Sequence, residues 1–289
     1  MFTQNRLTAP VFLHGLSHQH YAEVDKGWLS IKSMWQGEAV YLLENGRLTL
    51  NNSCYLILND QQPYTIHIEG DEIVESFCIF FPVSWAGDVL RNFLLPDDML
   101  LVEREEETAV SFYDVLHHHD QLVTPILQSL RQAQQQTYLD EGWQAERLHH
   151  LLAAMLQVQR QVRQEAAKLP AVRATTRKEL YRRLHLGRDF MQDNLHKSLS
   201  LAEIAQTAAL SPYHFLRNFK QLFGQTPHTY LTSQRLQRAT QLLAHTDIPV
   251  TDICLDVGFQ SLGSFSALFQ RVNGRSPTQY RQEFTHFDA

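Results

Sequence analysis

Cysteine is scarce in this sequence. Only three cysteines occur in 289 residues, and Cys54, Cys78 and Cys254 lie far apart, without the spacing of a zinc site. The sequence therefore gives no indication of a disulfide framework or of a cysteine metal centre. We expect reduced cysteines in or near the core of a cytoplasmic protein.

Long apolar runs are also missing. No run approaches the ~18 residues of a membrane-spanning helix, so no membrane segment is predicted. The N-terminus, Met1 to Arg6, lacks the basic, apolar and small-residue pattern of a signal peptide. Hydrophobic residues still make up 44% of the chain, which is enough for the folded cores of two ordinary domains.

Net positive charge is absent from the chain as a whole but not from its second half. The formal net charge is −6. Residues 1–170 contain 11 Lys and Arg against 22 Asp and Glu, whereas residues 171–289 contain 14 against 9. An acidic segment followed by a basic one is typical of a protein whose second half meets phosphates.

A short pattern occurs twice between Leu199 and Tyr280. From Ser211 onward each residue of the first copy has a counterpart 50 positions later, and Ile204 has one 49 positions later. The pairs are Ser211 and Ser261, Phe215 and Phe265, Phe219 and Phe269, Gly224 and Gly274, Thr226 and Ser276, Pro227 and Pro277, and Tyr230 and Tyr280. Two copies are too few for a solenoid, so a tandem motif is predicted.

Each copy has the signals of two short helices joined by a turn. In the first, Ser211 is a good N-cap, Pro212 suits the first helical position, and Gly224 suits the end of the helix. In the second, we expect Thr251 to cap the first helix and Ser261 the second. This is the helix-turn-helix unit, whose second helix enters the DNA major groove.

A predicted helix from Thr226 to His245 joins the two copies. At ~1.5 Å per residue this run spans roughly 30 Å. Successive major-groove faces on one side of DNA are about 34–36 Å apart. One chain is thus expected to hold two recognition helices over neighbouring groove segments.

With these motifs, Leu199–Arg281 resembles the DNA-binding domain of the AraC/XylS family of transcription regulators. The matching residues are Ser211-Pro212, Phe219-Lys220, Gly224, Thr226-Pro227, Tyr230, Arg235-Leu236, Ala239, Leu242-Leu243, Ile253, Val257-Gly258-Phe259, Ser264-Phe265, Phe269, Gly274, Ser276-Pro277 and Tyr280-Arg281. The resemblance implies a transcription regulator that binds double-stranded DNA, with an N-terminal cupin-like jelly roll for a small-molecule effector. We also expect a homodimer, RNA polymerase as a partner, and no membrane association.

The predicted fold class is a two-domain protein, with an all-β cupin-like jelly roll and a helical pair followed by an all-α double helix-turn-helix domain. The expected boundaries are 1–110 for the regulatory domain, 111–169 for the helical segment and 177–285 for the DNA-binding domain. The helical pair either packs on the β-domain or makes a dimer contact.

Local patterns within the first half predict the individual elements. Short strands are expected at Trp28–Met34, Ala39–Leu43, Arg47–Leu50, Tyr55–Leu58, Tyr64–Ile68 and Phe77–Phe81, with Asn45-Gly46 as a hairpin signal. Helices are expected at Ser84–Phe93, Phe112–Gln136 and Asp140–Lys168, and a solvated loop at Pro96–Thr108.

The predicted DNA-reading surfaces are the sides of the recognition helices opposite their buried phenylalanines. They comprise Tyr213, His214, Leu216, Arg217 and Lys220 in the first unit, and Leu262, Gly263, Ser264, Ser266, Ala267, Gln270 and Arg271 in the second. Arg217 either reads guanine or contacts phosphate. Thr226, Ser261 and Ser276 lie at predicted helix starts, where they cap the helix and where backbone N–H groups suit phosphates.

For the N-terminal half we predict an effector pocket that includes Trp28, Tyr41, Tyr55 and His67, although such residues also serve as core. No catalytic residue, cofactor or metal is assigned. Two alternatives stay open. One is a cupin-type metal-dependent enzyme domain, with ligands among His14, His18, His20, Glu23 and His67, fused to a DNA-binding domain. The other is a regulator that dimerises without a ligand.

Overall fold

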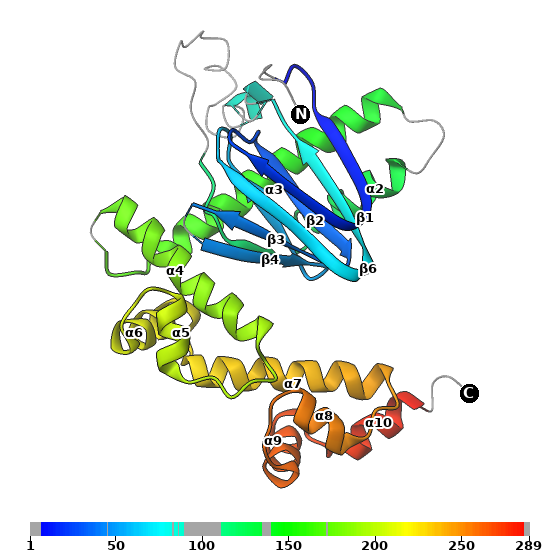
Figure 1. The fold of residues 1–289 in the computed structure, drawn as a ribbon, viewed down its shortest axis with the longest axis vertical. Helices are drawn as coiled ribbons and strands as arrows, with labels where there is room; N and C mark the ends of the chain where they lie inside the picture. Colours follow the sequence, from blue (N-terminus) through cyan, green and yellow to red (C-terminus); the bar gives the residue numbers. More distant parts are fainter. Residues whose placement is uncertain are drawn as a thin grey trace. The chain divides into compact units, whose positions relative to one another are not determined.

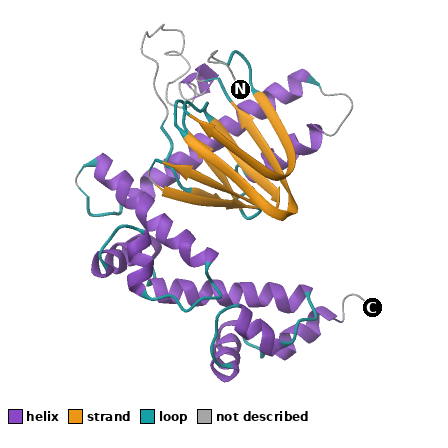
Figure 2. Cartoon of the chain, in the orientation of Figure 1, coloured by secondary structure: helices purple, strands orange, loops and turns teal. Residues whose placement is uncertain are grey.

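The computed structural model describes residues 7–44, 46–82, 84–85, 87–89, 111–134, 140–171 and 173–285. The chain divides into two compact units, Met1–Lys178 and Glu179–Ala289. The first unit combines a β-sheet with helices, and the second is helical throughout its described part (Figures 1 and 2). A β-rich N-terminal domain and a helical C-terminal domain were both predicted from the sequence, and both are confirmed.

The N-terminal unit is built on one antiparallel sheet. Its strands are β1 (Val11–Val24), β2 (Ser30–Gln36), β3 (Glu38–Leu43), β4 (Gly46–Asn51), β5 (Cys54–Leu58), β6 (Tyr64–Phe80) and β7 (Leu116–His118). The strand order is β4-β3-β6-β2-β5-β7, and β1 pairs with β6 outside this path.

Strand β6 organises the sheet. Strand β1 follows it along one edge, from Val24 opposite Tyr64 to Val11 opposite Phe80. The other edge is shared, since the first half of β6 pairs with β3 and the second half with β2. The sheet therefore divides into a β3-β4 part and a β2-β5-β7 part. These two parts fold toward each other, because β4 also contacts β2 and β5.

Two strand predictions need correction. Tyr64–Ile68 and Phe77–Phe81 were expected as separate strands with a turn at Gly70-Asp71, but they belong to the single strand β6. Strand β1 was not predicted, because most of its side chains on both faces are exposed or half-buried and the apolar alternation is weak. The β3-β4 hairpin closes with Leu43 opposite Gly46, at the position of the predicted turn.

Two helices, α2 (Thr124–Gln134) and α3 (Glu141–Ala166), cover one face of the sheet (Figure 1). The predicted helix over Phe112–Gln136 starts too early, because β7 and a turn precede α2. The Asp120 carboxylate ends the strand segment by accepting hydrogen bonds from the backbone N–H groups of Leu122 and Val123. The predicted Pro96–Thr108 loop lies outside the described residues, as does part of the Ser84–Phe93 helix.

The helices of the C-terminal unit follow the predicted repeat. After α4 (Ala174–Asp193), which spans the boundary between the units, the helices are α5 (Leu201–Thr207), α6 (Pro212–Phe223), α7 (Pro227–His245), α8 (Val250–Asp256), α9 (Leu262–Asn273) and α10 (Pro277–Thr285). Helices α5 and α6 form the first helix-turn-helix unit, α8 and α9 form the second, and α7 joins them (Figure 1).

Local capping explains most of these boundaries. Ser211 and Ser261 accept hydrogen bonds from the N–H groups of His214 and Ser264, as N-caps do. Gly224 and Gly274 end α6 and α9 with φ values of 71° and 76°. The predicted cap at Thr251 is wrong: α8 begins at Val250, directly after Pro249 in the N-cap position.

Each helix-turn-helix unit has its own aromatic core, and α7 contributes to both cores. Phe215 and Phe219 are fully buried in the first, where Phe219 meets Tyr230 of α7 edge-on at 5.6 Å. Phe265 and Phe269 are fully buried in the second, in one cluster with Leu236, Ala239 and Leu243 of α7. Because the start of α7 belongs to the first core and its later turns belong to the second, this helix fixes the spacing of the two helix-turn-helix units.

A second contact links the two helix-turn-helix units at the middle of α7. The Arg235 guanidinium donates hydrogen bonds to the carbonyls of Leu195 at 2.8 Å and Lys197 at 2.6 Å. Gly258, in the α8-α9 turn, has φ +90°, and a Cβ there would lie 2.2 Å from the Leu195 carbonyl oxygen and 2.9 Å from the Arg235 guanidinium. Only glycine permits both the backbone conformation and this close approach.

This packing predicts that Gly258→Ala destabilises the C-terminal unit more than Gly224→Ala does. Both substitutions force alanine into the left-handed region, which costs about 1–2 kcal/mol. Only position 258 adds a collision, for which a further cost of about 1–3 kcal/mol is expected. Gly224 is the matched control, because a Cβ there meets nothing within 4 Å.

The measurement is urea unfolding of the full chain followed by two signals. All four tryptophans, Trp28, Trp35, Trp85 and Trp143, belong to the N-terminal unit. Helical circular dichroism should therefore shift to lower urea while the tryptophan fluorescence transition stays in place. Equal losses for the two variants would show that the contact with Leu195 contributes nothing.

Candidate nucleic-acid interface and effector region

Helix α6 presents the predicted reading surface of the first unit. Its inward side consists of Phe215, Phe219 and Leu222, all buried. The opposite side carries Tyr213, His214, Arg217 and Lys220, which are exposed, and Leu216, which is half-buried. Tyr213 is 68% exposed, an unusual position for an aromatic ring and one that suits contact with a partner. The structure thus brings all five predicted residues onto one side of α6.

Helix α9 presents a chemically different surface. Leu262, Gly263, Ser264, Ala267, Gln270 and Arg271 are exposed, and Ser266 is half-buried. Phe265 and Phe269 point into the core, and Leu268 packs against the same cluster. Among its predicted reading residues Arg271 is the single cation, and it lies in the last turn. The scaffold of the two units is therefore repeated, but the chemistry of their outer faces is not.

The three predicted backbone-contact residues are all helix caps. Thr226 and Ser261 accept from the N–H groups of Thr229 at 3.2 Å and Ser264 at 3.4 Å. The Ser276 hydroxyl accepts a hydrogen bond from Gln279 N–H at 3.3 Å, and the Gln279 Oε1 accepts one from Ser276 N–H, as in a capping box. Capping is thus established for all three, and it leaves the other N–H groups of each first turn available to an anion.

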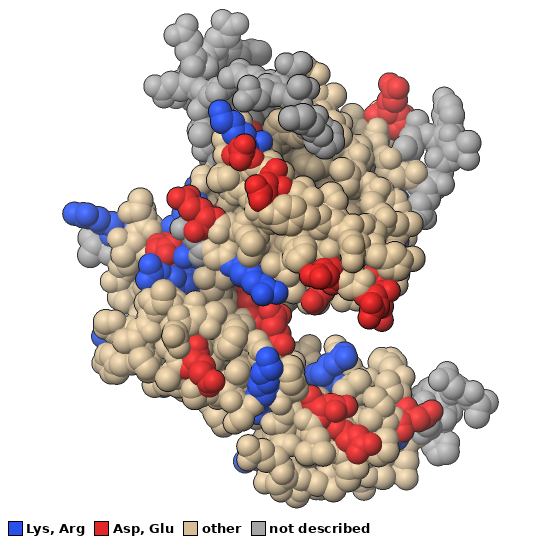
Figure 3. Space-filling view, viewed as in Figure 1, with Lys and Arg blue, Asp and Glu red and all other residues tan. Residues whose placement is uncertain are grey.

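Charges of both signs are visible on the C-terminal unit in the view of Figure 3, whereas acidic side chains predominate on the same view of the N-terminal unit. On this face, the basic side chains of the C-terminal unit are therefore interspersed with acidic ones. An interface with DNA would then depend on the particular cations of the recognition helices more than on one broad basic surface.

The predicted effector residues do not form one group. Trp28 lies edge-on to Phe80 at 5.9 Å, and Tyr41 packs against Tyr64 at 5.9 Å. Tyr55 instead stacks on His117 at 5.2 Å and donates a hydrogen bond to Asp120 at 2.6 Å. In the register of β5 and β2, Tyr55 lies opposite Ser33, on the other sheet face from Lys32.

His67 is exposed and pairs with Glu69 at 3.3 Å. Its ring faces solvent and contacts the Tyr21 ring. His67 is therefore separate from the buried aromatic residues.

The histidines considered as metal ligands are likewise dispersed. His14 bonds to Glu75 at 2.9 Å, and His18 and His20 are exposed. Within the described ranges, no group of three His, Cys, Asp or Glu residues has a metal-binding arrangement. His117 and His118 belong to strand β7, within the segment Phe112–Gln136 that was expected to be a helix.

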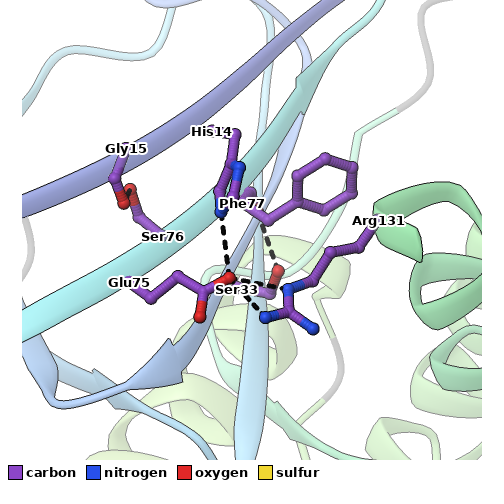
Figure 4. Close-up of polar contacts among 7 residues, drawn as sticks. All are labelled: His14, Gly15, Ser33, Glu75, Ser76, Phe77 and Arg131. Carbon is purple, nitrogen blue, oxygen red and sulfur yellow. Dashed lines mark hydrogen bonds and ion pairs between the residues drawn. The ribbon is translucent and has the colours of Figure 1, made fainter. Parts of the chain in front are cut away.

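A polar network links β1, β6 and α2 (Figure 4). The Glu75 carboxylate accepts hydrogen bonds from Arg131 Nε at 2.8 Å and from His14 Nε2 at 2.9 Å. Burial raises the pKa of Glu75, but the hydrogen bonds and charges of Arg131 and His14 outweigh it, so the pKa lies below its usual value. The Arg131 guanidinium also lies 4.6 Å from the Trp35 ring centre.

Sequence reasoning missed both this network and Lys32. Lys32 is only 2% exposed, in a strand whose neighbours Ser30 to Met34 are all buried. A lysine within a short run of apolar and small residues was the available signal. Its burial depends on strands that are distant in sequence, and the local pattern does not contain that information.

Comparison with known proteins adds to this geometry. A family model described as a helix-turn-helix domain matches residues 193–283. The activator RhaS of Escherichia fergusonii is 40% identical over 93 residues, which cover 32% of this chain and 34% of RhaS. The probable transcriptional regulator LumQ of Photobacterium leiognathi is 38% identical over 93 residues, 32% of this chain and 38% of LumQ. This chain thus spans about a third of the length of either relative.

A solved structure of a transcriptional regulator with an AraC-type DNA-binding domain, from Chromobacterium violaceum, is 31% identical. The match covers 35% of this chain and 91% of that chain, with a TM-score of 0.34.

The C-terminal region of this chain is therefore a helix-turn-helix domain. Its motifs resemble those of the AraC type, and the relatives that match it are named as transcription regulators. None of the helices in the described part of the chain combines the length and apolar character needed to cross a membrane.

The network around Glu75 predicts a pH-dependent contribution to stability. Because the folded-state pKa of Glu75 is depressed, its contribution is present above the unfolded-state value of about 4.3 and is lost as the pH falls through the folded-state value. Glu75→Gln should thus lower the free energy of unfolding at neutral pH, and the difference from wild type should disappear in acid.

Urea unfolding followed by tryptophan fluorescence over a pH series measures this difference. Glu69→Gln is the matched control on the same strand. The Glu69 carboxylate is exposed and pairs with the exposed His67, so this variant should show little effect at any pH. A Glu75→Gln deficit that persists unchanged at low pH would contradict the assigned linkage.

Proposed function

We propose that this protein is a sequence-specific DNA-binding regulator of transcription. The observation that carries the proposal is the pair of recognition helices, α6 and α9, each with a buried phenylalanine side and an exposed outer side. Both are anchored to α7, whose 19 residues span about 28 Å at ~1.5 Å per residue. That length suits two neighbouring major-groove segments.

The two helices differ in their proposed roles. On α6, the exposed Arg217 and Lys220 supply one residue suited to guanine and one suited to phosphate. The exposed face of α9 is mostly small and neutral, so we assign it the alignment of the domain on the adjacent groove. Thr226, Ser261 and Ser276 mark helix N-termini at which backbone N–H groups approach phosphates.

For the N-terminal unit we propose a cupin-like effector-binding domain. The proposed boundaries along the chain are 1–110 for the regulatory domain, 111–169 for the helical segment and 177–285 for the DNA-binding domain. Support comes from the curled sheet and the aromatic residues enclosed by it. The proposal includes a homodimer, contact with RNA polymerase, and a cytoplasmic location where the DNA is accessible.

Arg217→Ala is expected to weaken binding to the cognate site by about 1–3 kcal/mol and to relax the preference at one base position. The reason is loss of a bidentate contact with guanine. Genomic binding-site mapping first supplies the site, and gel-shift titrations then compare it with random DNA of equal length.

Arg217→Lys separates the two roles open to this residue. If Arg217 reads a base, lysine retains charge but loses the planar fork, so specificity falls nearly as far as with alanine. If the residue contacts phosphate, the lysine variant recovers most of the affinity and alanine loses equally on both DNAs. Failure of wild-type protein to prefer any DNA sequence would overturn the proposed function itself.

A further inference from the structure

Position 267 marks a pronounced chemical difference between the two recognition helices. With the offset of 50 residues, Ala267 of α9 corresponds to Arg217 of α6, and Gly263 corresponds to Tyr213. Ala267 and Gly263 are both exposed, as their counterparts are. The second unit therefore presents an apolar methyl group at the place where the first unit presents a guanidinium.

The outer side of α9 carries a glycine that the fold does not require. Gly263, Ser266 and Ala267 are spaced i, i+3 and i+4, so they lie on one side of the helix, opposite the two buried phenylalanines. A Cβ at Gly263 would meet the Ser261 hydroxyl oxygen at 3.8 Å, which is ordinary van der Waals contact. The backbone of Gly263 is helical, and glycine within a helix lowers its stability. Neither packing nor conformation therefore explains this residue.

Close approach of the helix to DNA does explain it. Glycine is used where a backbone must come near to a ligand. On α6, the long side chains of Tyr213 and Arg217 extend beyond the helix surface, so that helix contacts bases from a greater distance. On α9, Gly263 and Ser266 are small enough for the short side chain of Ala267 to reach the base edges.

The chemistry of these positions selects one feature of the major groove. The side chains of Gly263 and Ala267 contain no hydrogen-bond donor or acceptor, and the backbone groups around Ala267 bond within the helix. All four bases present donors or acceptors in the major groove, but thymine also presents an apolar 5-methyl group, which alanine contacts favourably. Thymine is therefore the base that Ala267 can distinguish.

We propose that Ala267 reads the 5-methyl group of thymine in the second major-groove segment, and that Gly263 and Ser266 permit the close approach that this contact needs. The inference rests on the proposed DNA-binding function and deepens it, because it names the base that the second unit selects. The second unit then contributes sequence selectivity in addition to the alignment assigned to α9.

The test compares the mapped DNA site with duplexes in which thymine is replaced by deoxyuridine, which lacks only the 5-methyl group. Each half of the site is substituted separately, and gel-shift titrations use the full chain. In the half contacted by α9, deoxyuridine should weaken binding about fourfold per contacted methyl group, which is the effect of burying one such group. 5-Bromodeoxyuridine, whose bromine has nearly the size of a methyl group, should restore the affinity.

Ala267→Gly removes the contacting methyl group and should abolish the difference between thymine and deoxyuridine in that half. The two affinities are compared as a ratio within each variant, so a smaller folded fraction does not change the result. Gly263→Gln should also abolish the difference, because the longer side chain holds α9 away from the bases, and it should stabilise the helix. Ala202→Gly, at an exposed alanine of α5, is the matched control and should leave the ratio unchanged.

Three results would overturn the inference: deoxyuridine weakens wild-type binding in neither half, the loss persists in Ala267→Gly, or Gly263→Gln retains it in full. If the outer side of α9 contacts a protein in place of DNA, the affinity for DNA stays the same in every variant, and this result would also overturn it. A wild-type protein that prefers its mapped site without any methyl effect removes only this inference. The absence of all sequence preference removes the proposed function.

Discussion

The hydrogen bonds from Arg235 to the carbonyls of Leu195 and Lys197 determine how two helix-turn-helix units share one scaffold. They tie the middle of α7 to the segment that precedes the first unit, and Gly258 brings the turn of the second unit against the same carbonyl. Three pieces of chain distant in sequence therefore meet at one point. The aromatic cores on either side set the tilt of each recognition helix, but this contact sets the relation between them.

The two domains use positive charge in opposite ways. On α6, Arg217 and Lys220 are exposed, where water compensates their charge until a polyanion replaces it. In the β-domain, Lys32 is buried among rings, where nothing in the described structure compensates it fully. The first arrangement favours rapid, salt-sensitive association.

Much of the C-terminal domain could be predicted because its signals are local. Ser211, Gly224 and Ser261 act through neighbours three or four residues away, so spacing alone reveals them. The predicted cap at Thr251 was wrong because α8 begins earlier, directly after Pro249. In the N-terminal domain, Gly70-Asp71 suggested a turn, yet β6 continues past it, and β1 pairs with Glu69 before it and with Val74 after it across a register shift. The burial of Lys32 and the bond between Arg131 and Glu75 depend on tertiary pairing, which no local pattern records. The sides of α6 and α9 were predictable from helical periodicity, whereas the separation of Tyr55 and His67 from Tyr41 was not.

The turns of the two units are related but no longer equivalent. Ala209 and Gly258 hold corresponding places, each with its N–H bonded three residues back, and Ala209 tolerates φ 49° with a side chain. At Gly258 a side chain would meet the Leu195 carbonyl, and Gln260 adds one residue before the next cap. After the duplication implied by the repeat, the copies became locked in their order. If the second unit carried the turn of the first, the side chain at position 258 would collide with the Leu195 carbonyl. The two turns are therefore not interchangeable.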